Sequence, residues 1–168
     1  MRIAQQELKI PQNHFRPTPV LSNGEHSSSN EKGGREMITI DEARKIIAAG
    51  EARAKVIGVP VNITVLDAGA HLKAFSRMDG AVLGSIDLAM GKARTAVLFQ
   101  TTSEAVWEYC KPGAPAHALE LSNGGLAPFP GGISLFAHDG TVIGAVGVSG
   151  GAVPQDLEIA KAAAAAVA

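Results

Sequence analysis

Charged side chains surround the end of the second predicted strand, and their chemistry suits an anionic ligand. Arg77 and Asp79 stand two residues apart there, and Lys92 follows within the next predicted helix. Guanidinium and ammonium groups bind carboxylates, so Arg77 and Lys92 are candidates for holding a small acid or an acidic cofactor. The alternative is that Arg77 pairs with Asp79 and that Lys92 lies on a solvated helix face. The sequence does not decide between the two.

Acid–base chemistry would need a titratable group beside such an anchor. Asp79, His117 and Glu120 are the candidates, because carboxyl and imidazole groups can accept and return a proton. The single cysteine, Cys110, could pair with His117 as a nucleophile. No third group is positioned to orient that pair, which favours a buried, apolar role for Cys110.

Motifs for metals and nucleotides are missing from the sequence. His71, His117 and His138 lack the short spacings of zinc sites, and one cysteine cannot build a multi-cysteine cluster. Gly131-Gly132 leads into a predicted strand rather than a helix, unlike a phosphate-binding loop. We therefore expect neither zinc nor a nucleotide, and the identity of any metal stays unknown.

The composition narrows the classes of partner. Fifteen basic residues nearly balance sixteen acidic ones, which leaves no strongly basic surface for nucleic acid. A hydrophobic share of 46% indicates a folded domain. Neither a secretory signal nor an apolar run of about 18 residues occurs, so we expect no membrane insertion and a cytoplasmic location.

The composition changes at Met37. Residues 1–36 are rich in proline, serine and glycine and show no apolar periodicity, which predicts a disordered or non-native extension. Translation from Met37 rather than Met1 is the alternative. Residues 37–168 have the size and apolar content of one domain.

Helices and hairpins alternate in this domain. A Thr39–Glu42 capping box predicts the first helix, Asp139-Gly140 predicts the turn of a late hairpin, and Ser103 can cap the third helix. Helices are expected over residues 39–57, 83–99, from 104 onward and over 155–167, and strands over 61–65, 71–77, 133–138 and 141–149. Two hairpins and covering helices define the α+β class with an antiparallel sheet.

Several motifs occur in the order and spacing of a known family. They include VNITVLD from Val61, RMDGA from Arg77, PGAP from Pro112, PGGI from Pro130 and VIGAVGVSGG from Val142. On these motifs the sequence resembles the GlcG/HbpS family, which also contains the C-terminal domain of PduO-type corrinoid adenosyltransferases. The resemblance covers essentially all of residues 37–168.

The resemblance implies a fold, an assembly and a ligand. The fold is a profilin-like three-layer arrangement with a five-stranded antiparallel sheet flanked by helices, and the assembly is a homo-oligomer, from dimer to octamer. The ligand is haem or a related tetrapyrrole, with haem handling or redox response as the role. Arg77 and Lys92 would then hold propionates, with the backbone of Gly131 and Gly132 against the ring.

An iron ligand is harder to assign, because the first predicted helix contains no histidine. His71, His117, Met78 or Tyr109 would have to serve. Other members of the family accompany catabolic genes. An enzyme or accessory subunit acting on a small organic acid is therefore the alternative, with Arg77 as the anchor and Asp79, His117 or Glu120 as the proton carrier. A third possibility is an accessory subunit with no ligand of its own.

Overall fold

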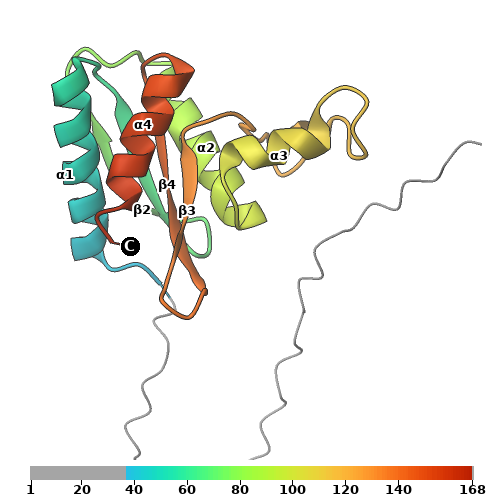
Figure 1. Cartoon of the computed structure of the whole chain (residues 1–168), viewed down its shortest axis with the longest axis horizontal. Coiled ribbons are helices and arrows are strands. Elements are labelled where there is room, and N and C mark those ends of the chain that lie inside the picture. The colour runs from blue at the N-terminus through green and yellow to red at the C-terminus, as the bar shows by residue number, and fades with distance from the viewer. Residues whose placement is uncertain (1–36, 168) are drawn as a thin grey trace, which may run out of the picture. The chain divides into compact units, whose positions relative to one another are not determined.

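A computed structural model describes residues 37–167, and the extension predicted over residues 1–36 lies outside them. Helices and strands alternate along this part of the chain (Figure 1). In order they are α1 (Ile40–Ile57), β1 (Asn62–Asp67), β2 (Leu72–Arg77), α2 (Ser85–Phe99), α3 (Ser103–Cys110), the 3-10 turn η1 (Leu119–Leu121), β3 (Gly132–Phe136), β4 (Val142–Ser149) and α4 (Val153–Ala164).

The strands form one antiparallel sheet in the order β2-β1-β4-β3. Both predicted hairpins are confirmed, and β1 and β4 pair at the centre of the sheet. The five-stranded sheet implied by the family resemblance is wrong for the described residues, in which the sheet has four strands. Residues 111–131, between α3 and β3, form turns and η1 instead, because glycine and proline interrupt any continuous ladder.

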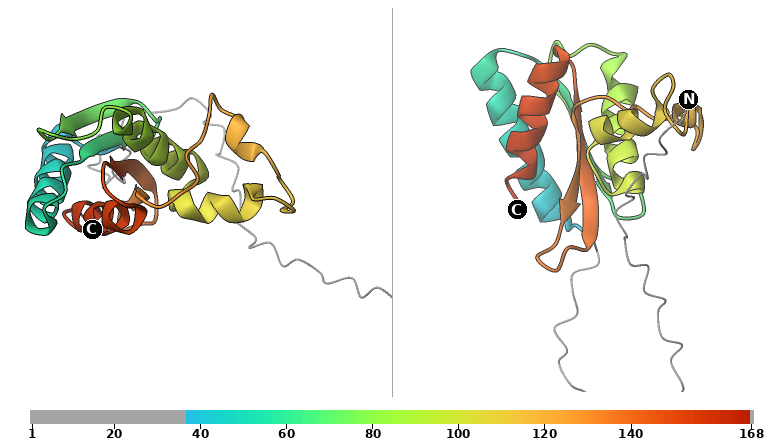
Figure 2. Two further views of the ribbon diagram at one scale, coloured as in Figure 1. Left: turned by 90° about the horizontal axis from the view of Figure 1, so that it is seen from above. Right: turned by 45° about the vertical axis from the view of Figure 1, so that its right-hand side comes forward.

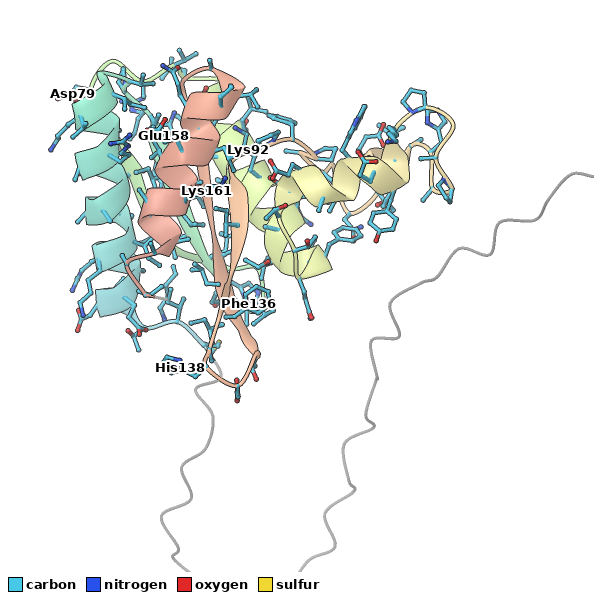
Figure 3. All side chains as sticks on the ribbon, viewed as in Figure 1. Asp79, Lys92, Phe136, His138, Glu158 and Lys161 are labelled. Carbon is cyan, nitrogen blue, oxygen red and sulfur yellow. The ribbon has the colours of Figure 1, made fainter. Side chains whose placement is uncertain are left out.

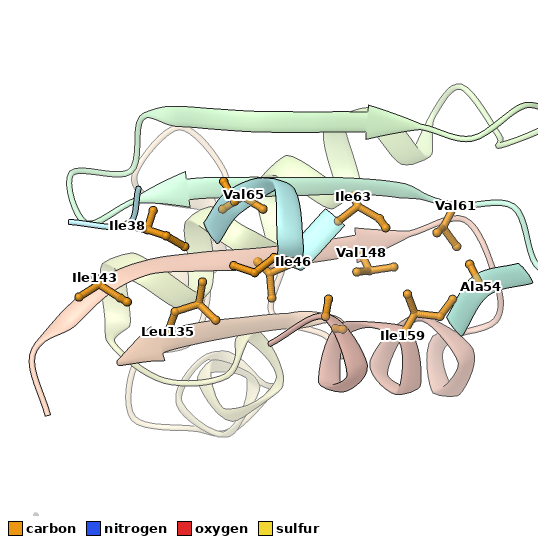
Figure 4. Packing of buried hydrophobic residues seen from close by; sticks show 14 residues of the cluster. Ile38, Ile46, Ala54, Val61, Ile63, Val65, Leu135, Ile143, Val148 and Ile159 are labelled. Carbon is orange, nitrogen blue, oxygen red and sulfur yellow. The ribbon is translucent and has the colours of Figure 1, made fainter. Parts of the chain in front are cut away.

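Helices cover both faces of the sheet, as two views show (Figure 2). On one face, α1 and α4 pack against the sheet through a core that includes Ile46, Ile63, Val148 and Ile159 (Figure 4). On the other face, α2 packs on β1, β3 and β4. The α+β class with helices on an antiparallel sheet is thus confirmed. Among residues 37–167 no helix combines the length and the apolar character needed to cross a bilayer.

Local sequence signals set the ends of α1. The Thr39 hydroxyl accepts from the Glu42 backbone N–H, and the Glu42 carboxylate accepts from the Thr39 backbone N–H. Gly58 ends the helix with φ +69°, a conformation that glycine adopts without a steric cost. The predicted capping box and terminal glycine are both confirmed.

Candidate functional site

Lys92 lies on the side of α2 that faces the sheet, and it is completely buried at 0% exposure. Its Nζ donates to Asp156 Oδ2 at 2.6 Å and to the Val148 carbonyl oxygen at 2.9 Å. The other Asp156 oxygen accepts from the Gly151 N–H. The interpretation of Lys92 as part of a solvated helix face is therefore wrong; Figure 3 shows it beside α4.

Burial and pairing act in opposite directions on this ammonium group. Burial lowers the pKa of Lys92 below its usual value, while the hydrogen bond and charge of Asp156 act to raise it, with burial the larger effect. The Phe129 ring lies over the ammonium, with its centroid 5.0 Å from Nζ. Lys92 thus has a carboxylate, a carbonyl oxygen and an aromatic ring around its ammonium group.

Gly131 and Gly132 lie against Lys92. A Cβ on Gly131 would stand 3.0 Å from Lys92 Nζ and 2.7 Å from the Val148 carbonyl oxygen. A Cβ on Gly132 would stand 2.2 Å from the Lys92 carbonyl oxygen. The two glycines therefore leave room for the lysine and its helix.

Hydrogen bonds from two helices hold the loop that precedes β3. The Ser103 hydroxyl donates to the Phe129 carbonyl at 2.6 Å and accepts from the Gly132 N–H at 2.9 Å. The Ala127 N–H donates to Thr95 Oγ1 at 2.8 Å. The predicted capping role of Ser103 is wrong, because Thr102 is the N-cap and the Ser103 side chain turns inward to the loop.

A pocket of about 830 Å³ opens between α3 and residues 128–130. Its walls combine aromatic and proline side chains with carboxyl groups. The apolar walls are Ala105, Trp107, Pro128, Phe129 and Pro130, and the polar ones are Thr102, Glu104, Glu108 and Glu120. Trp107 and Phe129 were not among the candidate site residues, although a tryptophan on a short helix and a Pro-Phe-Pro loop are signals of a shaped surface.

Glu120 links this pocket to two further candidate residues. Its Oε2 atom is buried without a hydrogen-bond partner, and its carboxyl group faces the thiol of Cys110. Burial is the main cause that raises the pKa of Cys110, and Glu120 adds to it. His117 is exposed, with Nδ1 3.3 Å from the Cys110 carbonyl oxygen. The structure thus places His117 and Glu120 near the end of α3, with the cysteine buried as predicted.

Arg77 and Asp79 line a different hollow, of about 340 Å³, together with Glu51, Lys55, Ser76 and Met78. Figure 3 shows Asp79 near the end of α1. Arg77 and Gly132 lie toward the same end of the sheet but on opposite edge strands, three strand spacings or about 14 Å apart. The structure therefore does not bring Arg77 together with Lys92 in one pocket.

The remaining candidate iron ligands also lie apart. His71 follows the β1–β2 turn, with Nδ1 3.4 Å from Asp67 Oδ1, at the opposite end of β2 from Arg77. Tyr109 lines a third hollow of about 410 Å³, and Met78 lines the hollow of Arg77. Across residues 37–167 no three side chains of His, Cys, Asp or Glu gather as a metal site.

Fold and pocket together define a small α+β domain with an antiparallel sheet, helices on both faces and a cavity of cofactor size. Residues 38–165 match the family described as "Haem degrading protein HbpS-like". The chain belongs to this HbpS-like family, which confirms the predicted GlcG/HbpS relationship.

Three relatives illustrate the match. An "Uncharacterized 15.0 kDa protein in dhaT-dhaS intergenic region" of Citrobacter freundii is 39% identical over 127 residues, 75% of this chain and 89% of that protein. The "Corrinoid adenosyltransferase PduO" of the same organism is 36% identical over 77% of this chain, but the match spans only 39% of the length of PduO. A crystal structure described as a "PduOC:Heme Complex" superposes with a TM-score of 0.74 at 36% identity, covering 78% of this chain and 95% of that one.

Proposed function

We propose that the protein binds haem or a related tetrapyrrole in the pocket between α3 and residues 128–130. The observation that carries the proposal is the pocket itself: its volume of about 830 Å³ lies within the range of about 300–1,000 Å³ typical of cofactor sites. Family membership supports it, because a relative with 36% identity is described in complex with heme.

The walls of the pocket suit a flat, apolar ring. Trp107 and Phe129 offer aromatic surface, and aromatic rings gain from offset or edge contacts beyond simple burial. The Ser103 hydrogen bonds hold the Phe129 backbone in place before any ligand arrives. Binding therefore requires little ordering of this wall, which favours affinity.

The residues present fit the ring and supply no usual iron ligand. Haem iron is held in proteins by histidine, cysteine, methionine or tyrosine, and none of the nine residues that line the pocket is of these types. Lys92 supports the wall from behind and is already paired with Asp156. We therefore derive no chemistry at the iron, and the proposal concerns binding alone.

The proposal also includes the assembly, the role and the location of the protein. We propose a homo-oligomer between dimer and octamer, a role in haem handling or redox response, and a cytoplasmic location. Light scattering after size exclusion measures the assembly. Fractionation of the native cells measures the location. A monomer at micromolar concentration would rule out the proposed homo-oligomer. Recovery of the protein outside the cytoplasm would rule out the proposed location.

Titration with haemin tests the binding. We expect a saturable shift of the Soret band and a weakening of about fivefold in Phe129→Ala, because the lost aromatic contact is worth about 1 kcal/mol. Phe136→Ala is the matched control, since Phe136 is an exposed phenylalanine on β3 outside this pocket. The absence of any saturable shift at micromolar haemin would end the proposal.

A small organic acid at the hollow of Arg77 is the second candidate, as an enzyme or accessory subunit. Arg77 and Lys55 supply two cations there, and Asp79 is the one proposed proton carrier that shares the hollow. His117 and Glu120 lie at the other site. A substrate panel comparing wild type with Arg77→Ala tests this candidate, and equal turnover in both would remove the anchor.

A further inference from the structure

We infer that the pocket between α3 and residues 128–130 recognises the tetrapyrrole ring independently of its iron, so that metal-free porphyrin binds as tightly as haem. The inference rests on the proposed function and adds the ligand class of the site. Two features of the pocket carry it: the chemistry of its donors and the placement of its carboxyl groups.

The donors nearest to the pocket are all engaged or turned elsewhere. Cys110 is 1% exposed, and its thiol faces the Glu120 carboxyl. Tyr109 lines the neighbouring hollow rather than this one. His117 lies on the turn after α3, against the Cys110 carbonyl, and does not line the pocket. An iron at the centre of a ring in this pocket would therefore gain no strong bond from these side chains.

The remaining contacts between the pocket and the ring do not depend on the metal. Trp107, Phe129 and the flanking prolines offer apolar surface, whose contribution scales with the ring area removed from water. Haem and metal-free porphyrin present nearly the same ring area and the same two propionates. Equal contact area without a metal bond predicts equal affinity.

The carboxyl groups favour entry of one edge of the ring. Glu104 and Glu108 come from α3 and Glu120 from η1, and none of the nine lining residues is basic. Glu108 is paired with Lys111, so Glu104 and Glu120 are the carboxyl groups without a cationic partner in the pocket wall. Propionates placed inside would meet groups of like charge, which is unfavourable. The apolar edge of the ring therefore enters, and the propionates face solvent.

The single tryptophan makes the test specific to this pocket, since Trp107 is the only indole in the chain. Full-length protein is titrated with haemin and, separately, with protoporphyrin IX, and quenching of Trp107 emission is followed. We expect saturable quenching by both ligands, with dissociation constants within about threefold. Phe129→Ala should weaken both by the same factor, and Phe136→Ala should weaken neither.

The charge argument has its own measurement. Glu104→Gln should leave both dissociation constants nearly unchanged, because propionates that face solvent do not meet this carboxyl group. Asp87→Asn, an equal change of charge at an exposed position of α2 outside the pocket, should leave both constants unchanged. Clearly tighter binding in Glu104→Gln than in Asp87→Asn would place the propionates beside this carboxyl group and overturn the orientation of the ring.

Each adverse outcome identifies which claim fails. Binding of haemin at least tenfold tighter than protoporphyrin IX would overturn the inference and leave haem binding standing. A Soret shift with haemin without quenching of Trp107 would overturn the assignment of the pocket. No binding of either ligand would end the proposed function together with the inference.

Discussion

Lys92 and Asp156 form a buried ion pair, 2.6 Å between Nζ and Oδ2, that joins helices on opposite faces of the sheet. Lys92 belongs to α2 on one face and Asp156 to the first turn of α4 on the other. The lysine side chain reaches across beside Gly131, where a Cβ would stand 3.0 Å from Nζ. The same ammonium lies under Phe129, so the pair also supports the wall of the pocket.

Asp156→Asn should be strongly destabilising, because it leaves the Lys92 ammonium in the interior without its counter-charge. Removing one partner of a buried pair costs about 3–5 kcal/mol. Urea unfolding followed by circular dichroism measures the loss. Replacing both partners, Lys92→Met with Asp156→Leu, should recover much of it, since no charge then stays buried. A single variant within about 1 kcal/mol of wild type would contradict this account of the pair.

Gly132→Ala should prevent normal packing of β3 on α2. The new Cβ would stand 2.2 Å from the Lys92 carbonyl oxygen and 2.6 Å from its carbon, and these backbone atoms cannot rotate away. We expect a loss of about 3 kcal/mol or more in the free energy of unfolding. Gly84→Ala is the control, because Gly84 has φ −61° and no atom within 4 Å of a new Cβ. Similar stabilities for the two variants would refute the close approach.

Ser103→Ala should loosen the Phe129 wall while the rest of the fold persists. The change removes the hydroxyl that bonds the Phe129 carbonyl and the Gly132 N–H, and an unpaired buried donor costs about 1–3 kcal/mol. Hydrogen exchange at the Gly132 amide should accelerate, and haemin should bind more weakly. In Ser122→Ala, whose hydroxyl bonds the Leu119 carbonyl, both measurements should stay close to wild type. Unchanged exchange at Gly132 in Ser103→Ala would show that the hydroxyl does not hold the loop.

Elements that local rules determine were predictable. The Thr39–Glu42 box and the Asp139-Gly140 turn depend on neighbours within a few residues, so the sequence shows both halves of each interaction. The fifth strand came from family resemblance alone, and the sheet formed within residues 37–167 has four strands.

The ion pair depends on a partner 64 residues away, which no local pattern shows. The sequence of each helix nevertheless indicated that its charged residue would need a buried partner. Asp156 shares the buried stripe of α4 with Ile159, Ala160 and Ala163, and Lys92 shares that of α2 with Ala89, Ala93 and Ala96. A charged residue on an apolar stripe has to find a partner, so the two stripes together predict a pair. The pocket gave no such signal, because its walls come from α3 and a loop that meet only in the folded chain.

The Cys110 thiol should make the stability of the protein fall in mildly alkaline solution. Burial, followed by the nearby Glu120 carboxyl, raises the pKa of Cys110. Above the usual thiol pKa the unfolded chain has lost a proton that the folded chain keeps. The free energy of unfolding therefore decreases as the pH rises from that value toward the folded pKa, by up to about 1.4 kcal/mol per pH unit.

Lys92 changes the free energy of unfolding in the opposite direction. Because its pKa is lowered, the folded chain releases this proton before the unfolded chain does as the pH rises. The Cys110 effect is therefore measured as a difference: urea unfolding of wild type and of Cys110→Ala between pH 7.5 and about 9.5. The wild type should lose more stability over this interval than the variant.

Native Cys110 should also react with iodoacetamide far more slowly than the unfolded chain does, because only the thiolate is nucleophilic and the side chain is 1% exposed. Parallel pH profiles together with rapid alkylation of folded protein would show that the thiol is neither buried nor held in its protonated form.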